Sequence, residues 1–366
     1  MKLKSIETFT TPDIGFTRVT ADDGAQGWGQ VSTYNSDITS TVLHRQVAPH
    51  VLGRDTTNLD DLLDRVSERE HKFPGSYLAR AIGGLDTAVW DLRGKQAGVP
   101  VTALIGGTPG KIRAYASSMK RDITPADEAT RLQRLADEKG FTAFKVRAGS
   151  EVGRNRDEWP GRTEEIIPTM RRALPHADLL IDANSCYAPD RAIEIGHLLQ
   201  DHGFTHFEEP CPYWELEQTR RVTQALEIDV TGGEQDWDLT IWRRMIETKA
   251  VDIVQPDILY AGGLARTLRV CRMAADAGLP VTPHCANLGL VTLFTMHLLR
   301  AIPNPGKYLE FSIEGPDYYP WQYGLFTIDP YGIEDGQAAV PDTPGWGIEI
   351  APDWLARSAS HITTLD

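Results

Sequence analysis

The sequence has few cysteines, and their spacing does not match a disulfide framework or a zinc site. Only four occur among 366 residues, and no two of them form a CxxC pair. We therefore expect reduced thiols, which are the usual state of cysteine in a cytoplasm. The four positions are Cys186, Cys211, Cys271 and Cys285.

Long apolar runs and an excess of positive charge are also absent. No stretch approaches the roughly 18 apolar residues of a membrane helix, and the first residues lack the apolar region of a signal peptide. The formal net charge is −14, whereas nucleic-acid binding requires a basic face. We expect a cytoplasmic protein that binds neither membrane nor nucleic acid. An anionic substrate must then be held locally, by a metal or by a few cations.

Several common catalytic and phosphate-binding motifs are missing. The sequence contains no HExxH, no GxSxG, and neither GxGxxG nor GxxxxGK. Gly106 and Gly107, and likewise Gly262 and Gly263, are therefore expected to serve turns. A zinc protease, a serine hydrolase and a nucleotide-binding loop are not supported.

The first part of the chain indicates a small α+β domain. Alternating segments predict an antiparallel meander, and amphipathic segments that follow predict helices without any strand between them. We place this capping domain at residues 1–112. The strands are expected at 2–9, at 17–19 and within GAQGWGQVSTY, and the helices at 38–51, 59–70 and 77–96.

The rest of the chain changes to regular strand–helix alternation. Eight strand-like segments separated by seven helical ones predict an α/β fold, a (β/α)₇β TIM-like barrel, over residues 113–314. A tail rich in Gly, Pro and aromatic residues follows at 315–366, and we expect it to pack back on the capping domain. The strand segments are RAYASS, TAFKVRA, ADLLIDAN, THFEEP, DVTGGE, VDIVQPDI, LPVTPHC and KYLEFSI; the helices lie near 126–139, 163–174, 189–202, 215–226, 238–249, 263–277 and 288–300.

Three carboxylates close three successive barrel strands. Asp182, Glu208 and Glu234 are each separated by 26 residues, which is about one strand–helix unit. Carboxylates brought together repel one another unless a cation lies between them, and an all-oxygen set suits a hard cation such as Mg²⁺. Asn184, on the same face as Asp182, is expected to bind substrate as a hydrogen-bond donor beside the metal, and otherwise it is only a turn former.

Further polar residues lie at the ends of other strands. Lys145 and Arg147 are two residues apart, so both are expected to point into the barrel. Asp257 and His284 are one strand–helix unit apart and predict a dyad in which the carboxylate orients the imidazole. Glu310 ends the last strand, where it is either a substrate acceptor or an ordinary strand-end acid.

Together these positions resemble the enolase superfamily, mandelate racemase subgroup. The resemblance implies one Mg²⁺ per site, with Mn²⁺ as an alternative, removal of the proton α to a substrate carboxylate, and a homo-oligomer from dimer to octamer. It implies a small-molecule carboxylate substrate, a sugar acid. Residue by residue, it assigns Asp182, Glu208 and Glu234 as metal ligands, Lys145 and Arg147 as the Lys-x-Lys strand, and Asp257, His284 and Glu310 as the dyad and last-strand acid.

One departure from the family pattern bears on the reaction. Arg147 stands where the family often has a second lysine, and arginine is a poor proton acceptor at neutral pH. A racemase needs a base on each face of the substrate, whereas a dehydratase can use one base and one acid. We therefore expect a Mg²⁺-dependent acid-sugar dehydratase that forms a 2-keto-3-deoxy acid. An epimerase, racemase or cycloisomerase stays open if Lys145 acts as a base, and a noncatalytic barrel is the third alternative.

The segment that covers the site is the least defined by sequence. The connection from Thr10 to Phe16 is too short for the mobile loop that closes related enzymes. We expect Tyr34 and Asn35 to bind substrate and to contribute cover. The other candidates are residues 71–76, a neighbouring subunit and the tail aromatics Tyr318, Trp321 and Tyr323. For these tail aromatics, filling the seam between cap and barrel is the favoured alternative.

Overall fold

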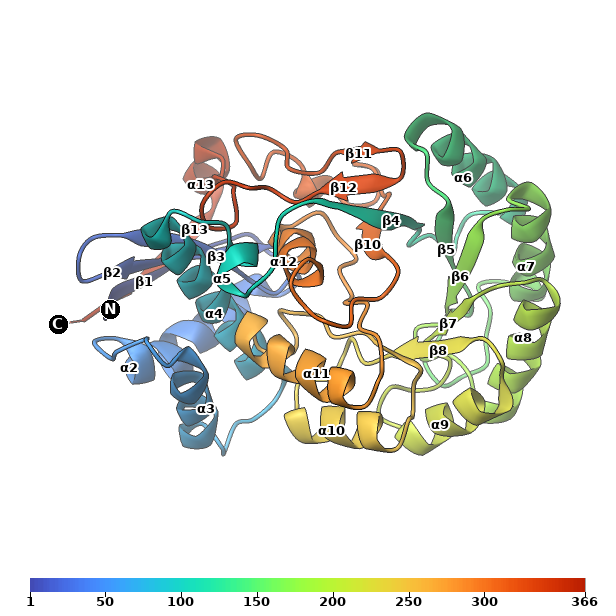
Figure 1. Ribbon diagram of the computed structural model, residues 1–366, viewed down its shortest axis with the longest axis horizontal. Helices are drawn as coiled ribbons and strands as arrows, with labels where there is room; N and C mark the ends of the chain where they lie inside the picture. The colour runs from blue at the N-terminus through green and yellow to red at the C-terminus, as the bar shows by residue number, and fades with distance from the viewer. Residues whose placement is uncertain (366) are drawn as a thin grey trace.

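The computed structural model describes residues 1–365, so the last residue of the predicted tail, Asp366, lies outside the described residues. The N-terminal part contains an antiparallel sheet of β1 (Leu3–Thr10), β2 (Gly15–Ala21) and β3 (Gln26–Val31). The C-terminal strand β13 (Ala359–Thr364) adds to the free edge of β1, which places both chain ends at the cap (Figure 1). The predicted meander is confirmed, and the β1–β2 hairpin is short.

The cap also contains helices, of which α4 (Ser76–Ala97) packs most extensively on this sheet. It is preceded by α1 (Ser36–Val42), α2 (Ala48–Val51) and α3 (Leu59–Arg69), and a π-helical turn, Leu43–Val47, interrupts the single helix predicted over 38–51. Helix α4 approaches β3 closely because glycines line the contact. A Cβ on Gly29 would lie 2.5 Å from the Gly84 carbonyl oxygen and the Ala88 nitrogen, so only glycine fits there.

The barrel strands run parallel in sequence order. Strands β4 (Lys111–Ser117), β5 (Ala143–Arg147), β6 (Asp178–Asp182), β7 (His206–Glu208), β8 (Asp229–Gly232) and β9 (Ile253–Val254) form one ladder, and β10 (Leu309–Ser312) pairs with β4. The covering helices are α6 (Pro125–Lys139), α7 (Arg162–Ala173), α8 (Pro189–Asp201), α9 (Leu216–Ala225), α10 (Leu239–Glu247), α11 (Leu264–Asp276) and α12 (Leu290–Leu299). All seven agree with the predicted segments within two residues.

The seventh predicted strand, LPVTPHC, is wrong as a regular strand. It is reduced to isolated bridges at Val281, because Pro280 and Pro283 have no backbone N–H to donate to a ladder. The segment still follows β9, since Thr282 N donates to the Val254 carbonyl and His284 N donates to that of Pro256. His284 is therefore held at the same end of the barrel as the polar residues of the other strands.

The tail returns across the molecule from barrel to cap. Strands β11 (Ile333–Glu334) and β12 (Gln337–Ala339) extend the sheet at β4, and helix α13 (Pro352–Arg357) precedes β13. Asp91 of α4 fixes the tail, accepting one hydrogen bond from Trp346 N at 2.8 Å and another from Trp28 N at 2.7 Å. Helix α4, strand β3 and the tail are thus joined through one buried carboxylate.

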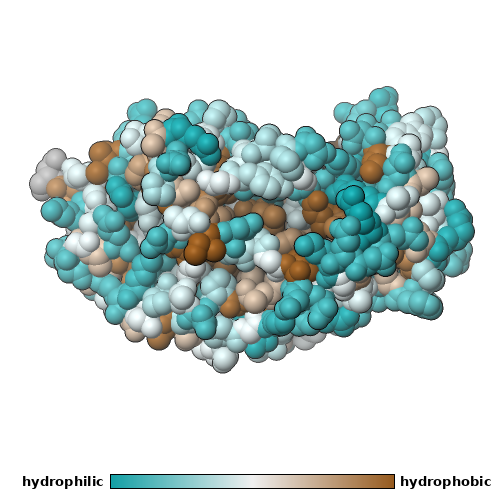
Figure 2. Space-filling model, turned by 90° about the horizontal axis from the view of Figure 1, so that it is seen from above, coloured by the Kyte–Doolittle hydropathy of each residue, from teal (hydrophilic) through white to brown (hydrophobic). Residues whose placement is uncertain are grey.

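The outer surface is mainly polar on the face in Figure 2, where hydrophobic residues form small separate patches. Within residues 1–365 no helix has both the length and the apolar character of a membrane span. The four cysteines are buried and are not disulfide-bonded.

Candidate active site

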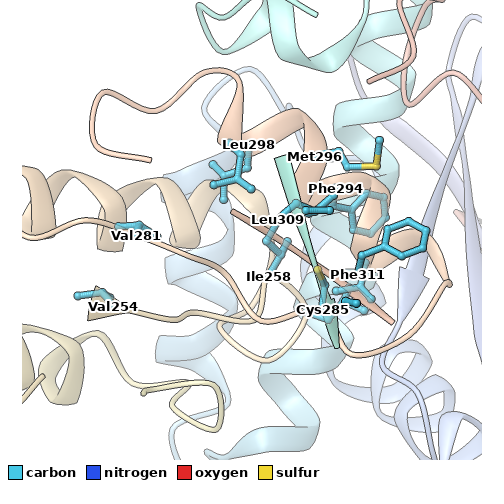
Figure 3. Packing of buried hydrophobic residues seen from close by; sticks show 14 of the residues in the cluster. Val254, Ile258, Val281, Cys285, Phe294, Met296, Leu298, Leu309 and Phe311 are labelled. Atoms are coloured by element: carbon cyan, nitrogen blue, oxygen red, sulfur yellow. The ribbon is translucent and has the colours of Figure 1, made fainter. Parts of the chain in front are cut away.

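The hydrophobic core directs polar residues of the last barrel strands toward the barrel mouth. Ile258, Cys285 and Leu309 belong to one apolar cluster, which also includes side chains of helix α12 such as Phe294 and Leu298 (Figure 3). Because side chains alternate along extended backbone, the residues beside them lie on the opposite face. Those residues are the predicted site residues Asp257, His284 and Glu310, and all three are joined by hydrogen bonds or ion pairs to the polar cluster described next.

Three carboxylates from β6, β7 and the end of β8 converge at the centre of this mouth. One oxygen from each of Asp182, Glu208 and Glu234 lies within 4.8 Å of the others, and all three side chains are buried. Burial, with the neighbouring carboxylates, raises the pKa of Glu208 to about 8 and also raises that of Glu234. A buried set of like charges with only oxygen donors fits a divalent hard cation, which removes their repulsion.

Lys145 of β5 lies beneath the carboxylates and contacts two of them together with the last-strand acid. Its Nζ is 2.7 Å from Glu208 Oε2, 2.7 Å from Glu310 Oε1 and 3.9 Å from Asp182 Oδ2. Burial alone would lower the pKa of Lys145, but Glu208 and Glu310 outweigh it and the pKa is raised. The lysine is thus a buried cation at one side of the carboxylate centre.

Arg147 lies beside Lys145 and pairs with Asp182. Its Nη1 donates to Asp182 Oδ2 and, at 2.9 Å, to Asn184 Oδ1, while its Nε donates to the Ser118 carbonyl at 2.8 Å. The predicted face of β5 is thus observed, with both cations turned into the barrel. A planar guanidinium held by several acceptors is a fixed positive group rather than a proton acceptor.

Asn184 has a left-handed backbone, with φ 39°, and its amide is fully engaged by neighbours. Its Nδ2 donates to Asp182 Oδ2 at 3.1 Å, and its Oδ1 accepts from Arg147 and from Arg121 Nη2 at 2.5 Å. Both sequence interpretations therefore describe part of the residue. It sits in a turn conformation and also orients the first carboxylate of the set.

The Asp257–His284 pair faces the carboxylates from the opposite side. His284 Nδ1 lies 2.9 Å from Asp257 Oδ2, and Nε2 lies 3.4 Å from Glu234 Oε2. Burial would lower the pKa of His284, but the charges of Glu234 and Asp257 raise it well above its ordinary value. With Asp257 fixing Nδ1, the second ring nitrogen is presented to the centre of the mouth.

Glu310 joins the two sides. Ser117 Oγ donates to its Oε1 at 2.8 Å and Cys285 N donates to its Oε2 at 2.8 Å, in addition to the Lys145 contact. Although burial opposes ionisation, Lys145 and His284 hold the pKa of Glu310 well below its usual range. This carboxylate is therefore a fixed anion in the barrel floor.

Three residues of the site were missed by sequence reasoning. Arg121, in the loop after β4, donates to Asn184, and no periodicity marks it. Gln255 Nε2 donates to Glu208 Oε2 at 3.2 Å, and its position two residues before Asp257 in the strand could have revealed it. Glu209 follows Glu208 with φ 40°, and its buried Oε1 has no partner among the described residues.

Aromatic residues of the cap and the tail meet at the side of the mouth. Tyr34 makes an edge contact with Trp321 at 6.2 Å between ring centroids, and Trp321 also packs on Tyr319 at 5.4 Å. Tyr318 reaches the loop after β4, where its hydroxyl donates to the Met119 carbonyl at 3.4 Å. Asn35, by contrast, is exposed and serves as the residue before α1, without a side-chain contact to the polar cluster.

Comparison with known families places the whole architecture. The model for the mandelate racemase/muconate lactonizing enzyme N-terminal domain matches residues 3–106, and the enolase C-terminal domain-like model matches residues 127–354. The first match lies in the cap, and the second covers most of the barrel and part of the tail.

Individual relatives agree with these matches. The chain is 28% identical over 92% of its length to 88% of an arabinonate dehydratase from Saccharolobus solfataricus, and 29% identical over 93% to 89% of a D-galactarolactone cycloisomerase from Agrobacterium fabrum. A crystal structure from Roseobacter denitrificans, named provisionally as a racemase, is 76% identical with full coverage of both chains and a TM-score of 0.99.

A second structure carries a metal. It is a mandelate racemase/muconate lactonizing protein from Paracoccus denitrificans complexed with magnesium, 28% identical over 99% of both chains with a TM-score of 0.88. From the two domain matches and the shared fold, the chain belongs to the mandelate racemase/muconate lactonizing enzyme family of the enolase superfamily.

Proposed function

We propose that this protein is a Mg²⁺-dependent acid-sugar dehydratase, a hydro-lyase that converts a polyhydroxy acid into a 2-keto-3-deoxy acid. The observation that carries the proposal is the arrangement of three carboxylates between two different proton-handling sides. Lys145 and Arg147 lie on one side, and the Asp257–His284 pair lies on the other. Relatives named as arabinonate and D-galactonate dehydratases support the reaction class.

The three converging carboxylates would hold the metal. Asp182, Glu208 and Glu234 fit Mg²⁺ by donor type, proximity and burial. When bound, the ion supplies positive charge to the substrate carboxylate as it becomes an ene-diolate. Lys145 and Arg147 add fixed positive charge nearby, since Arg147 is held by Asn184 and the Ser118 carbonyl before substrate arrives.

His284 is the principal acid and base in this proposal. The neutral form of His284 takes the proton from the carbon next to the carboxylate on Nε2, while Asp257 keeps the ring oriented and stabilises the imidazolium. The same proton then protonates the β-hydroxyl, whose C–O bond breaks so that water leaves. The enol product gains a proton at the former β-carbon as its hydroxyl proton is lost, which yields the 2-keto-3-deoxy acid.

An isomerase is the second candidate, and two observations favour it. Lys145 lies across the carboxylate centre from His284, so its ammonium group could return a proton from the other face. The relatives also include the D-galactarolactone cycloisomerase and a 3,6-anhydro-D-galactonate cycloisomerase from Zobellia galactanivorans, which is 25% identical over 97% of this chain.

Incubation of the protein with Mg²⁺ and a panel of sugar acids in D₂O separates these reactions. Formation of a 2-keto-3-deoxy acid with loss of water supports the dehydratase. Deuterium at the carbon next to the carboxylate without loss of water identifies an epimerase or racemase, and a ring-opened or ring-closed isomer identifies a cycloisomerase. Absence of exchange and of product across aldonic acids, aldaric acids and their lactones overturns the proposal.

A further inference from the structure

Tyr260 is a residue of the barrel mouth that none of the roles above uses. It lies between β9 and α11, three residues after Asp257, and its ring centroid is 6.0 Å from that of His284 with the planes at 43°. Its backbone N–H donates to Asp257 Oδ1 at 3.1 Å, while Asp257 Oδ2 bonds His284 Nδ1. One carboxylate therefore fixes the imidazole and the neighbouring tyrosine relative to each other.

The cap holds the ring of Tyr260. The guanidinium carbon of Arg80, on α4, lies 3.3 Å from the ring centroid, which is a close cation–π stack. Arg80 Nη1 also donates to Ser32 Oγ, directly after β3, and Ser32 is buried. The tyrosine beside the acid–base pair is thus positioned from both domains, by Asp257 of the barrel and by Arg80 of the cap.

The hydroxyl of Tyr260 is left for another molecule. Within residues 1–365 it makes no hydrogen bond to protein, and it is not among the polar atoms closed off from solvent. The residue is half-buried at the mouth, beside His284 and against Arg80 of the cap. A phenol with a fixed ring and an unused O–H provides one donor and one acceptor at a defined place.

We propose that Tyr260 is a specificity residue whose hydroxyl hydrogen-bonds a hydroxyl group on the carbon chain of the substrate, beyond the carbon that loses its proton. Arg80 is the positioning residue that keeps the ring in place. This inference rests on the proposed function, because it assumes a polyhydroxy acid bound at the carboxylate centre. It adds the prediction that recognition of the chain beyond the reacting carbon depends on contact between cap and barrel.

A purely structural role is the competing explanation, and Tyr260→Phe separates the two. The variant keeps the ring, and so the Arg80 stack and the His284 contact, but removes the hydroxyl. Binding of two probes is measured by calorimetry in Mg²⁺: D-galactonate, which carries distal hydroxyls, and glycolate, which has only the carboxylate and the α-hydroxyl. We expect affinity for D-galactonate to fall about 3- to 10-fold, the effect of one neutral hydrogen bond, with affinity for glycolate unchanged.

Arg80 is tested in the same way. Arg80→Met should weaken D-galactonate binding to a similar extent. The double variant with Tyr260→Phe should lose little more affinity, because both changes remove the same hydrogen bond between Tyr260 and the substrate. Arg80→Lys should retain more affinity for D-galactonate than Arg80→Met, because lysine keeps the positive charge. Arg134→Met, an exposed residue of α6, is the matched control and should behave like the unaltered protein. For an acid that is turned over, the loss should appear in KM more than in kcat.

The outcomes are distinguishable. Equal affinity of Tyr260→Phe and the unaltered protein for D-galactonate overturns the role of Tyr260 and leaves the proposed function intact. An equal loss for glycolate shows a general disturbance of the site, which also overturns it. If the unaltered protein with Mg²⁺ binds neither probe and turns over no acid of the panel, the proposed function itself fails, and this inference with it.

Discussion

Arg147 and Asp182 occupy paired positions on β5 and β6, and their side chains form an ion pair at the barrel mouth. The pairing follows from parallel register, since a side chain at the end of one strand lies beside its partner at the end of the next. An arginine at this point is tied to a carboxylate of the candidate metal centre. The same position occupied by lysine would carry a shorter, titratable group.

The first prediction concerns this pair. Arg147→Lys should lower dehydration by about 10- to 100-fold, because lysine cannot keep the contacts of the guanidinium with Asp182, Asn184 and the Ser118 carbonyl. At the same time it should increase α-proton exchange, since lysine can accept a proton. Both rates are measured by NMR in D₂O. Arg147→Met is the control that loses charge and base together, and exchange in that variant as fast as in Arg147→Lys would contradict the argument.

A second prediction concerns metal binding. Mg²⁺ at about 100 times its Kd should stabilise the protein by about 2.7 kcal/mol, and chelation with EDTA should reverse the effect. Asp182→Asn should weaken Mg²⁺ binding by at least about 100-fold, because loss even of groups that only support ligands costs about 10- to 100-fold. Calorimetry and thermal unfolding with and without Mg²⁺ measure both effects. An unchanged Mg²⁺ affinity in Asp182→Asn would remove this residue from the ligand set.

A third prediction concerns the Asp257–His284 pair and its role in proton transfer. His284→Asn should reduce kcat by about 10²- to 10⁴-fold, the usual contribution of a general acid or base, with Mg²⁺ affinity nearly unchanged. Asp257→Asn should have a smaller effect, because the imidazole remains but is less well oriented. Steady-state kinetics and calorimetry provide the two readouts. Full activity in His284→Asn would transfer the base role to Lys145.

Much of the barrel could be predicted from sequence, because the apolar runs that indicate single strands also repeat at the spacing of strand–helix units. Asp182, Glu208 and Glu234 each end an apolar run, and the repeated spacing places them at one mouth. The segment around His284 shows the limit of this reasoning. Its apolar pattern suggests a strand, but Pro280 and Pro283 remove ladder donors, and hydrogen bonds to β9 on one side and to residues 304–306 on the other hold it in place.

Residues whose partners lie in another loop or in the other domain could not be predicted in the same way. Arg121 and Tyr260 lie in loops, where no sequence period indicates the direction of a side chain. Arg80 lies in a helix rich in glycine and alanine, and this pattern does not indicate which residue it contacts. The bond from Arg121 to Asn184 and the stack of Arg80 on Tyr260 each join positions more than 60 residues apart. Such long-range pairs depend on the finished packing, and a single sequence does not reveal them.

A fourth prediction concerns the joint between α4 and α11. Asp86 of α4 is buried and accepts hydrogen bonds from Leu264 N at 2.6 Å and Ala265 N at 3.3 Å, which are free donors in the first turn of α11. Asp86→Ala should therefore cost about 1–2 kcal/mol of unfolding free energy, the range for losing a helix cap. Urea denaturation measures it. A neutral result would show that water satisfies these donors equally well.

The last prediction concerns pH and His297 of α12. This side chain is fully buried and joins three segments, since Nδ1 accepts from Thr102 N at 3.1 Å and Nε2 lies 3.3 Å from the Trp346 carbonyl. Burial lowers the pKa of His297 to about 4, whereas histidine in an unfolded chain has a pKa of about 6.5. Between pH 4 and pH 6.5, His297 is therefore protonated in the unfolded chain but neutral in the folded protein.

Stability from this histidine is therefore fully present above pH 6.5 and is lost as the pH falls toward 4, by an amount of up to about 3 kcal/mol. His297→Gln should be less stable at pH 7, because it loses part of the bonding to Thr102 and Trp346, but its unfolding free energy should fall less steeply between pH 6.5 and pH 4. Urea denaturation of the variant and of the unaltered protein at pH 6.5 and at pH 4 measures how steeply each unfolding free energy falls. Identical slopes in the variant and the unaltered protein would show that His297 does not resist protonation in the folded state.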